Sequence, residues 1–114
     1  MNLAVVITAY RPGPEFLNLV QSLAGKDFAE VVVVDDGSGP ESEELFASVA
    51  MVRGVRLLRH GVRLGRGASL KTAFNQVICQ LPDVRGVVTA SEFDDWVRFE
   101  SQANPPLGSF TWIW

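Results

Sequence analysis

Short apolar runs rich in valine alternate along the chain with segments of helical periodicity. Four runs have the length and continuity of strands that are buried on both faces: residues 3–8, 30–35, 55–59 and 86–90. Between them, apolar residues recur at intervals of three and four, as on one face of a helix, over residues 16–23, 45–52 and 70–81. The alternation predicts an α/β fold in which the parallel strands lie in the order 3-2-1-4.

The predicted fold class is a Rossmann-like, three-layer αβα parallel sheet. After residue 90 the periodic pattern ends, and residues 91–114 contain all three tryptophans and finish in the apolar run 110–114. We therefore expect a domain over residues 1–90 and an atypical, irregular C-terminal tail over 91–114. The apolar end could pack on the sheet or stay without a partner strand, and the sequence leaves both possibilities open.

Two carboxylates follow the second predicted strand. Asp35 and Asp36 come directly after four valines and precede a Gly-Ser turn. The carboxyl ends of parallel strands are where open α/β sheets bind ligands. Adjacent side chains on an extended backbone point in opposite directions, so one carboxylate is expected to face a ligand and the other to hold the next loop. Ser38 and Glu41 have the spacing of a helix capping box.

A glycine-rich turn precedes the third predicted helix. Residues 65–72 come close to a phosphate-binding Walker A loop, but Leu70 replaces the glycine that lets backbone amides approach a phosphate. The same leucine argues against a dinucleotide-binding loop. Two interpretations remain: the turn and Lys71 receive an anion at the helix N-terminus, or the glycines shape the turn and Lys71 is solvated.

The amino-acid composition limits which classes of protein this chain can belong to. The 114 residues are 47% hydrophobic, enough for the core of one domain, and the formal net charge of −3 argues against a nucleic-acid-binding protein. Five arginines lie within residues 53–66 and could face a phosphate or line a solvated edge. The single cysteine, Cys79, excludes an internal disulfide and predicts an inert helix thiol. The single histidine, His60, has no catalytic partners nearby in sequence, which predicts a surface role.

No apolar run approaches the roughly 20 residues that span a bilayer, so we expect no transmembrane segment. The first residues also lack the basic region of a signal peptide. Together these features predict a cytoplasmic protein.

Four segments together resemble the family 2 glycosyltransferases of GT-A fold. Residues 6–10 are similar to the family's first strand and Ala-Tyr turn, and 32–38 to its second-strand Asp-Asp-Gly-Ser signature. Residues 58–74 are similar to its glycine-rich segment, and 87–90 to the strand that leads to its metal motif. The resemblance covers residues 3–90 and is closest to the polyprenyl-phosphate hexose transferases.

The resemblance implies the N-terminal half of such a fold, which binds a UDP- or GDP-sugar donor for transfer of a hexose. Thr8 and Tyr10 would frame the base beside Ala9, and Asp36 would accept a hydrogen bond from it. The remaining expected donor-binding residues are Val34, through its backbone, Asp35, Arg63, Gly65 and Lys71. A polyprenyl phosphate or a glycan would be the acceptor in the intact family.

The sequence departs from the family at two places. Arg63 stands where the family commonly has asparagine. The Asp-x-Asp that binds Mg²⁺ or Mn²⁺ should follow Ala90, but here Glu92 and Asp94 are one residue out of register. They are the candidate metal ligands, although we expect no bound metal in this chain. We assign no catalytic residue and expect a truncated domain without transfer activity of its own. The alternative is a non-enzymatic α/β interaction or receiver-like module that uses Asp35 or Asp36.

Overall fold

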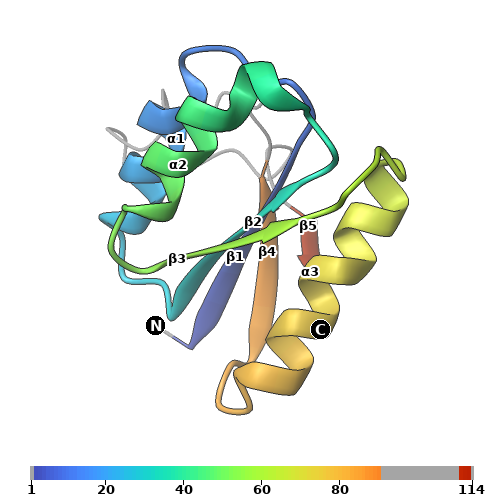
Figure 1. The fold of residues 1–114 in the computed structure, drawn as a ribbon. Coiled ribbons are helices and arrows are strands. Elements are labelled where there is room, and N and C mark those ends of the chain that lie inside the picture. The colour runs from blue at the N-terminus through green and yellow to red at the C-terminus, as the bar shows by residue number, and fades with distance from the viewer. Residues whose placement is uncertain (1, 91–110, 114) are drawn as a thin grey trace.

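A computed structural model of the chain describes residues 2–90 and 111–113. The strands are β1 (Leu3–Ala9), β2 (Glu30–Asp35), β3 (Val55–Arg59), β4 (Gly86–Ala90) and β5 (Thr111–Ile113). The helices are α1 (Phe16–Ala24), a 3-10 turn (Pro40–Ser42), α2 (Glu43–Ala50) and α3 (Arg66–Gln80). The predicted strands and helices are therefore present, in the predicted sequence order (Figure 1).

The sheet has the order β3-β2-β1-β4-β5. The first four strands are parallel, which confirms the predicted order 3-2-1-4. β5 adds to the free edge of β4 in the antiparallel direction, so part of the apolar C-terminal run does pair with the sheet. The register places Ala9 opposite Asp35, and Asp35 opposite Arg59. The first three strands consequently end side by side, and the loops that follow them meet at one edge.

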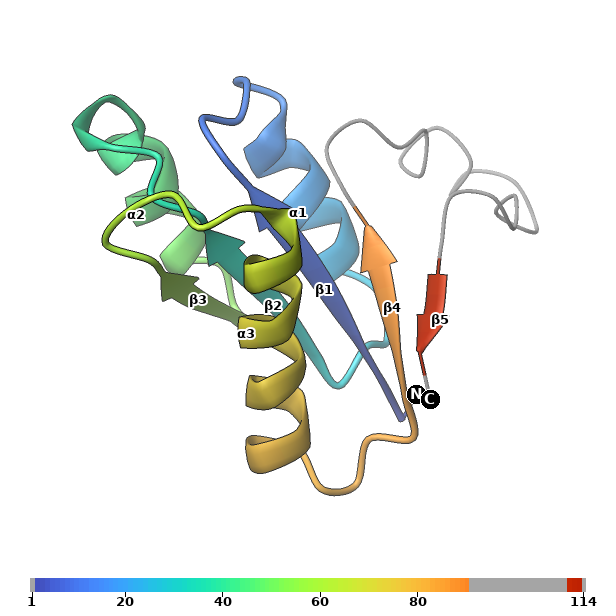
Figure 2. The same ribbon diagram turned by 90° about the vertical axis from the view of Figure 1, so that its right-hand side faces the viewer.

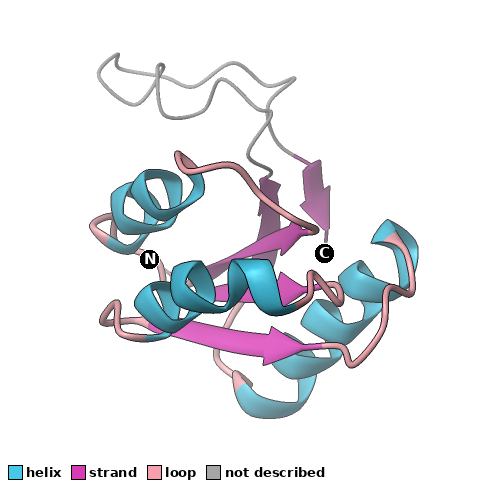
Figure 3. Ribbon diagram, turned by 45° about the horizontal axis from the view of Figure 1, so that its top comes forward, coloured by secondary structure: helices cyan, strands magenta, loops and turns pink. Residues whose placement is uncertain are grey.

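Two apolar layers cover the sheet because successive side chains of a strand point to opposite faces. One face packs against α1 and α2 through Val5, Ile7, Val31 and Val33. The other packs against α3 through Ala4, Val6, Val32 and Val34. Figures 2 and 3 show the sheet between these two helical layers. The predicted three-layer αβα arrangement is confirmed.

Helix α3 packs on the sheet along a narrower stripe than the sequence predicts. Ser69, Ala73 and Val77, spaced four residues apart, are its buried residues. Ile78 falls within the apolar spacing predicted over residues 70–81 but is 59% exposed, so the prediction that it lies on the packed face is wrong. The apolar pattern does not predict that Ser69 is buried, because serine is polar. Its hydroxyl is satisfied by donating a hydrogen bond to the carbonyl oxygen of Gly65 at 3.0 Å.

The prediction of a capping box at Ser38 is also wrong. The 3-10 turn begins after Gly39, and no side chain caps it. The Ser38 hydroxyl instead accepts a hydrogen bond from the backbone N–H of Arg11 at 2.9 Å. Ser38 therefore joins the loops that follow β1 and β2, which contributes to the edge described below.

Within the part of the chain that the structure describes, no helix has both the length and the apolarity needed to cross a membrane.

The two helices on one face meet through Phe16 of α1 and Phe46 of α2. Both side chains are fully buried, and their rings contact edge to face with centroids 6.0 Å apart. We expect Phe16→Ala to lower the free energy of unfolding by about 3–5 kcal/mol, through lost burial and the cavity left behind. Urea unfolding at pH 7 measures this change. The exposed Ile78→Ala is the control, and equal losses from the two changes would contradict the packing described.

Candidate functional site

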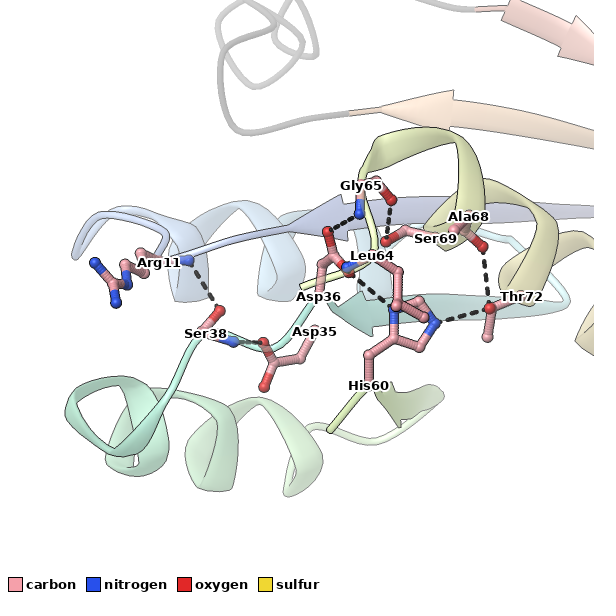
Figure 4. A network of polar contacts seen from close by, with 10 residues as sticks. All are labelled: Arg11, Asp35, Asp36, Ser38, His60, Leu64, Gly65, Ala68, Ser69 and Thr72. Atoms are coloured by element: carbon pink, nitrogen blue, oxygen red, sulfur yellow. Dashed lines mark hydrogen bonds and ion pairs between the residues drawn. The ribbon is translucent and has the colours of Figure 1, made fainter. Parts of the chain in front are cut away.

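Three loops meet at the carboxyl edge of the sheet. Tyr10 and Arg11 follow β1, Asp36 follows β2, and His60 follows β3. The backbone already links these loops, because the N–H of Asp36 donates to the carbonyl of Ala9 and the N–H of His60 donates to that of Asp35. The polar side chains of this edge form the network shown in Figure 4.

Asp35 holds the turn after β2 and the end of β3 together. Its buried carboxylate accepts from the backbone N–H of Ser38 at 3.0 Å and from Nε of Arg59 at 3.0 Å. Arg59 also binds both carboxylate oxygens of Glu43 on α2, at 2.8 and 2.6 Å. The hydrogen bond with Arg59 lowers the pKa of Glu43, and the same bond raises the pKa of Arg59. Asp35 therefore has the loop-holding role that one member of the pair was expected to have.

Asp36 binds the glycine-rich loop from the opposite side. Its Oδ1 accepts from the N–H of Leu64 at 2.8 Å, and its Oδ2 accepts from the N–H of Gly65 at 2.9 Å. His60 Nδ1 lies 2.9 Å from Oδ1. Burial acts to raise the pKa of Asp36, but the hydrogen bonds from His60, Leu64 and Gly65 outweigh it, so this pKa lies below its usual value.

These contacts use most of the hydrogen bonds that the Asp36 carboxylate can accept. An ionised carboxylate can accept about four hydrogen bonds, and Asp36 uses three of them on its own chain. Its residue exposure is 4%. The carboxylate expected to face a ligand is thus also a structural group, and these three contacts leave one acceptor direction on Oδ2 unused.

His60 is not a surface residue, so the sequence prediction for it is wrong. Its side chain is 10% exposed, and both ring nitrogens have partners. Nδ1 contacts Asp36, and Nε2 lies 2.8 Å from the hydroxyl oxygen of Thr72 on α3. One signal in the sequence could have found it: His60 follows the third strand, at the same sheet edge as Asp36.

Gly37 lets the glycine-rich loop lie directly against the turn after β2. Its φ is +72°, which favours glycine. A Cβ at this position would lie 2.4 Å from the carbonyl carbon of Val62 and 2.5 Å from the backbone nitrogen of Arg63. The loop backbone therefore occupies the space that any side chain at residue 37 would need.

Arg63 covers the aromatic ring expected to frame a base. Its guanidinium carbon lies 4.1 Å from the centroid of the Tyr10 ring, and that of Arg11 lies 5.2 Å from it. A guanidinium over an aromatic face is attracted by the ring's π-electrons. The structure thus joins Tyr10 to the glycine-rich loop, and through Leu64 and Gly65 of that loop to Asp36.

The other predicted site residues differ in what they present. Val34 is fully buried and Ala9 is 7% exposed, so only their backbones are available, while Thr8 is half-buried. Gly65 gives its N–H to Asp36. Lys71 is exposed on α3, five residues after the helix begins at Arg66.

Positive charge is concentrated around this loop. Between Glu44 and Asp83 the sequence has no Asp or Glu, and its cations are Arg53, Arg56, Arg59, Arg63, Arg66 and Lys71. Arg59 is neutralised by Asp35 and Glu43, and Arg56 pairs with Glu30 at 3.5 Å. Arg63, Arg66 and Lys71 remain on or after the loop, where they favour an anion.

The candidate metal ligands Glu92 and Asp94 lie outside the described residues. Within residues 2–90 and 111–113, no three His, Cys, Asp or Glu side chains form a group that could hold a metal ion. The described edge of the sheet therefore offers no complete metal site of its own.

Comparison with known protein families assigns the chain to one family. The model of the family "Glycosyl transferase family 2" matches residues 4–97. Two curated relatives are the N-acetylglucosaminyl-diphospho-decaprenol L-rhamnosyltransferases of Mycobacterium tuberculosis strains CDC 1551 / Oshkosh and ATCC 25618 / H37Rv. Each is 36% identical over 107 residues, covering 92% of this chain and 32% of the relative. The chain thus spans about a third of their length.

Solved structures agree on the fold. The crystal structure of S. aureus TarS 1–349 matches with a TM-score of 0.65 and 21% identity, over 89% of this chain and 31% of that one. Its complex with UDP-GlcNAc matches with a TM-score of 0.58, 21% identity, and coverage of 89% and 30%. At this identity the likeness establishes the fold alone.

We expect Gly37→Ala to lower the free energy of unfolding by about 3 kcal/mol or more, because the new methyl group meets backbone atoms and alanine is strained at positive φ. Gly61→Ala is the matched control, since a Cβ there meets nothing within 4 Å. It should change stability by no more than about 0.5 kcal/mol. Urea unfolding compares the two, and a tolerated Gly37→Ala would show that the loop does not lie on this turn.

The contribution of Asp36 to stability should depend on pH. Because folding lowers its pKa, the stabilisation is present above the pKa of the unfolded carboxyl, about 3.9, and is lost as pH falls through the lower folded value. We expect Asp36→Asn to cost about 1–3 kcal/mol at pH 6, with a smaller difference from wild type at pH 3. Urea unfolding at the two pH values tests this, with the exposed Asp83→Asn as control. A difference that grows on acidification would contradict it.

Proposed function

Because the chain belongs to glycosyl transferase family 2, we propose that the carboxyl edge of its sheet binds a nucleotide-diphospho-sugar donor, UDP- or GDP-linked, for transfer of the hexose. The observation that carries the proposal is the joining of Asp36, the glycine-rich loop and the Arg63–Tyr10 pair into one edge. The same edge holds an acceptor for a base, a planar surface and unneutralised cations.

Recognition of the base falls to Asp36 and the Arg63–Tyr10 pair. An ionised carboxylate only accepts hydrogen bonds, so the acceptor direction left on Asp36 suits a base that presents a ring N–H. Uracil and guanine present one, whereas cytosine and adenine present an acceptor at the corresponding ring nitrogen. Since Arg63 covers Tyr10, the base would stack on the guanidinium plane, or on the ring once Arg63 moves aside.

The diphosphate would lie toward the start of α3. This helix begins at Arg66 directly after the glycine-rich loop, and its N-terminus carries partial positive charge. Arg63, Arg66 and Lys71 add full charges, with no carboxylate between Glu44 and Asp83 in sequence. Lys71 as a point charge and the arginines as forked donors suit phosphate oxygens.

The metal ion, the sugar acceptor and the cellular compartment are proposals that concern the whole protein. Family 2 transferases generally use a divalent metal, and Glu92 and Asp94 are the ligands that we propose for Mg²⁺ or Mn²⁺, which would neutralise charge on the leaving diphosphate. The named relative acts on a decaprenol-linked sugar, which supports a polyprenyl-linked or glycan acceptor here. We also propose a cytoplasmic site of action and keep the division at residue 90, with nucleotide-sugar binding in residues 1–90.

The receiver-like alternative finds no support in the geometry. The family match covers residues 4–97 and so includes the segment that carries Asp35 and Asp36. Both carboxylates also hold loops of the sheet edge.

Base selectivity tests the proposed function. We expect UDP and GDP to bind at least about tenfold more tightly than CDP and ADP, the size of one hydrogen bond to a charged group. Asp36→Asn should reduce this selectivity, because its amide can donate as well as accept. Calorimetry on wild type, Asp36→Asn and the control Asp83→Asn measures both effects. Equal affinity for all four nucleotides would exclude the role given to Asp36, and no binding of any would exclude the donor site.

A further inference from the structure

His60 connects three elements at the donor edge. It follows β3, its Nδ1 lies 2.9 Å from Oδ1 of Asp36 at the end of β2, and its Nε2 lies 2.8 Å from the hydroxyl of Thr72 on α3. The ring is 10% exposed. The imidazole is thus enclosed in a polar contact on each side, and nothing in the proposed donor recognition accounts for it.

The chemistry of Asp36 assigns the donor in one of these contacts. An ionised carboxylate can only accept, so Nδ1 of His60 donates to Oδ1 of Asp36. The Thr72 hydroxyl contacts both Nε2, at 2.8 Å, and the carbonyl of Ala68, at 3.1 Å, and its single proton can be given to either.

The neutral ring satisfies both of its contacts: Nδ1–H donates to Asp36, and Nε2 accepts from Thr72. The imidazole is therefore held from both sides, which fixes its orientation toward Asp36.

Asp36 connects His60 to the glycine-rich loop. Its two oxygens accept from the backbone N–H groups of Leu64 and Gly65, just before α3 begins. Figure 4 shows His60 and the loop converging on this one carboxylate. A group that fixes the rotamer of Asp36 thus fixes the loop and the one free acceptor direction together.

We infer that His60 is a positioning residue of the donor site: it orients the Asp36 carboxylate and, through it, the glycine-rich loop. This role rests on the donor binding proposed above. Nδ1 of His60 contacts the same oxygen that accepts from Leu64, so the ring holds the carboxylate in the rotamer that also reaches the loop.

The first test needs no variant, because His60 is the one histidine in the chain and its ring signals are unambiguous. Nitrogen-15 NMR of the ligand-free protein at pH 8 should show Nδ1 carrying the proton that it donates to Asp36. A neutral ring that carries its proton on Nε2 would overturn the assignment.

The second test uses His60→Phe and His60→Asn. Phenylalanine keeps the ring without a donor, so amide exchange of Leu64 and Gly65 should accelerate in the ligand-free protein, and UDP or GDP affinity should fall about tenfold. Asparagine has an N–H near the position of Nδ1 and should stay within about threefold of wild type at pH 8. Unchanged amide exchange and affinity in His60→Phe would overturn the role of His60.

Rescue by the conservative variant separates positioning from a merely structural role. His60→Asn can donate to Asp36 and should restore both slow exchange of Leu64 and Gly65 and nucleotide affinity, whereas His60→Phe should lose both. Equal losses in the two variants would overturn the proposal. A wild-type protein that binds no nucleotide would overturn the donor site itself, whereas the NMR and exchange measurements judge His60 without any ligand.

Discussion

The carboxylate of Asp36 is the group on which the arrangement of the carboxyl edge depends. It is almost completely buried, so its charge would cost free energy without hydrogen-bond donors around it. The donors come from the loop after β3 and from His60, which are distant in sequence. The loop can reach the carboxylate only because Gly37 has no side chain in its way. One buried charge therefore fixes where the glycine-rich loop lies and where α3 begins.

The neighbouring carboxylate performs a parallel task in the opposite direction. Asp35 binds Ser38 and Arg59, and Arg59 continues to Glu43 on α2. Adjacent residues at a strand end point to opposite sides, so the pair links the helical layers on both faces to the edge of the sheet. The arginines at this edge therefore have different roles. Arg59 is paired with Asp35 and Glu43 and holds the fold together. Arg63 lies over Tyr10, close to where an anionic ligand would bind.

Much of the fold and part of the site could be predicted from the sequence. Continuous valine runs and helical spacing gave the elements and the parallel order, because burial on two faces leaves little choice of pattern. Local spacing was a poorer guide at Ser38 and Ile78, where a distant backbone N–H and the narrow contact of α3 with the sheet decided the outcome. For His60, the absence of catalytic neighbours in sequence said nothing about neighbours in space.

The sequence by itself determined the α/β class, the family, and the sheet edge at which the chemistry lies, since these follow from periodicity and from short motifs. Only the tertiary structure decided what each polar side chain does there. It made Asp36 a shared acceptor, placed Arg63 on Tyr10, and enclosed His60 between Asp36 and Thr72. The physical reason is that hydrogen bonds and cation–π contacts act over a few ångströms. Their partners are therefore chosen by the packing of elements 12 or more residues apart in sequence, 12 for His60 and Thr72 and 24 for His60 and Asp36, and no local pattern encodes that choice.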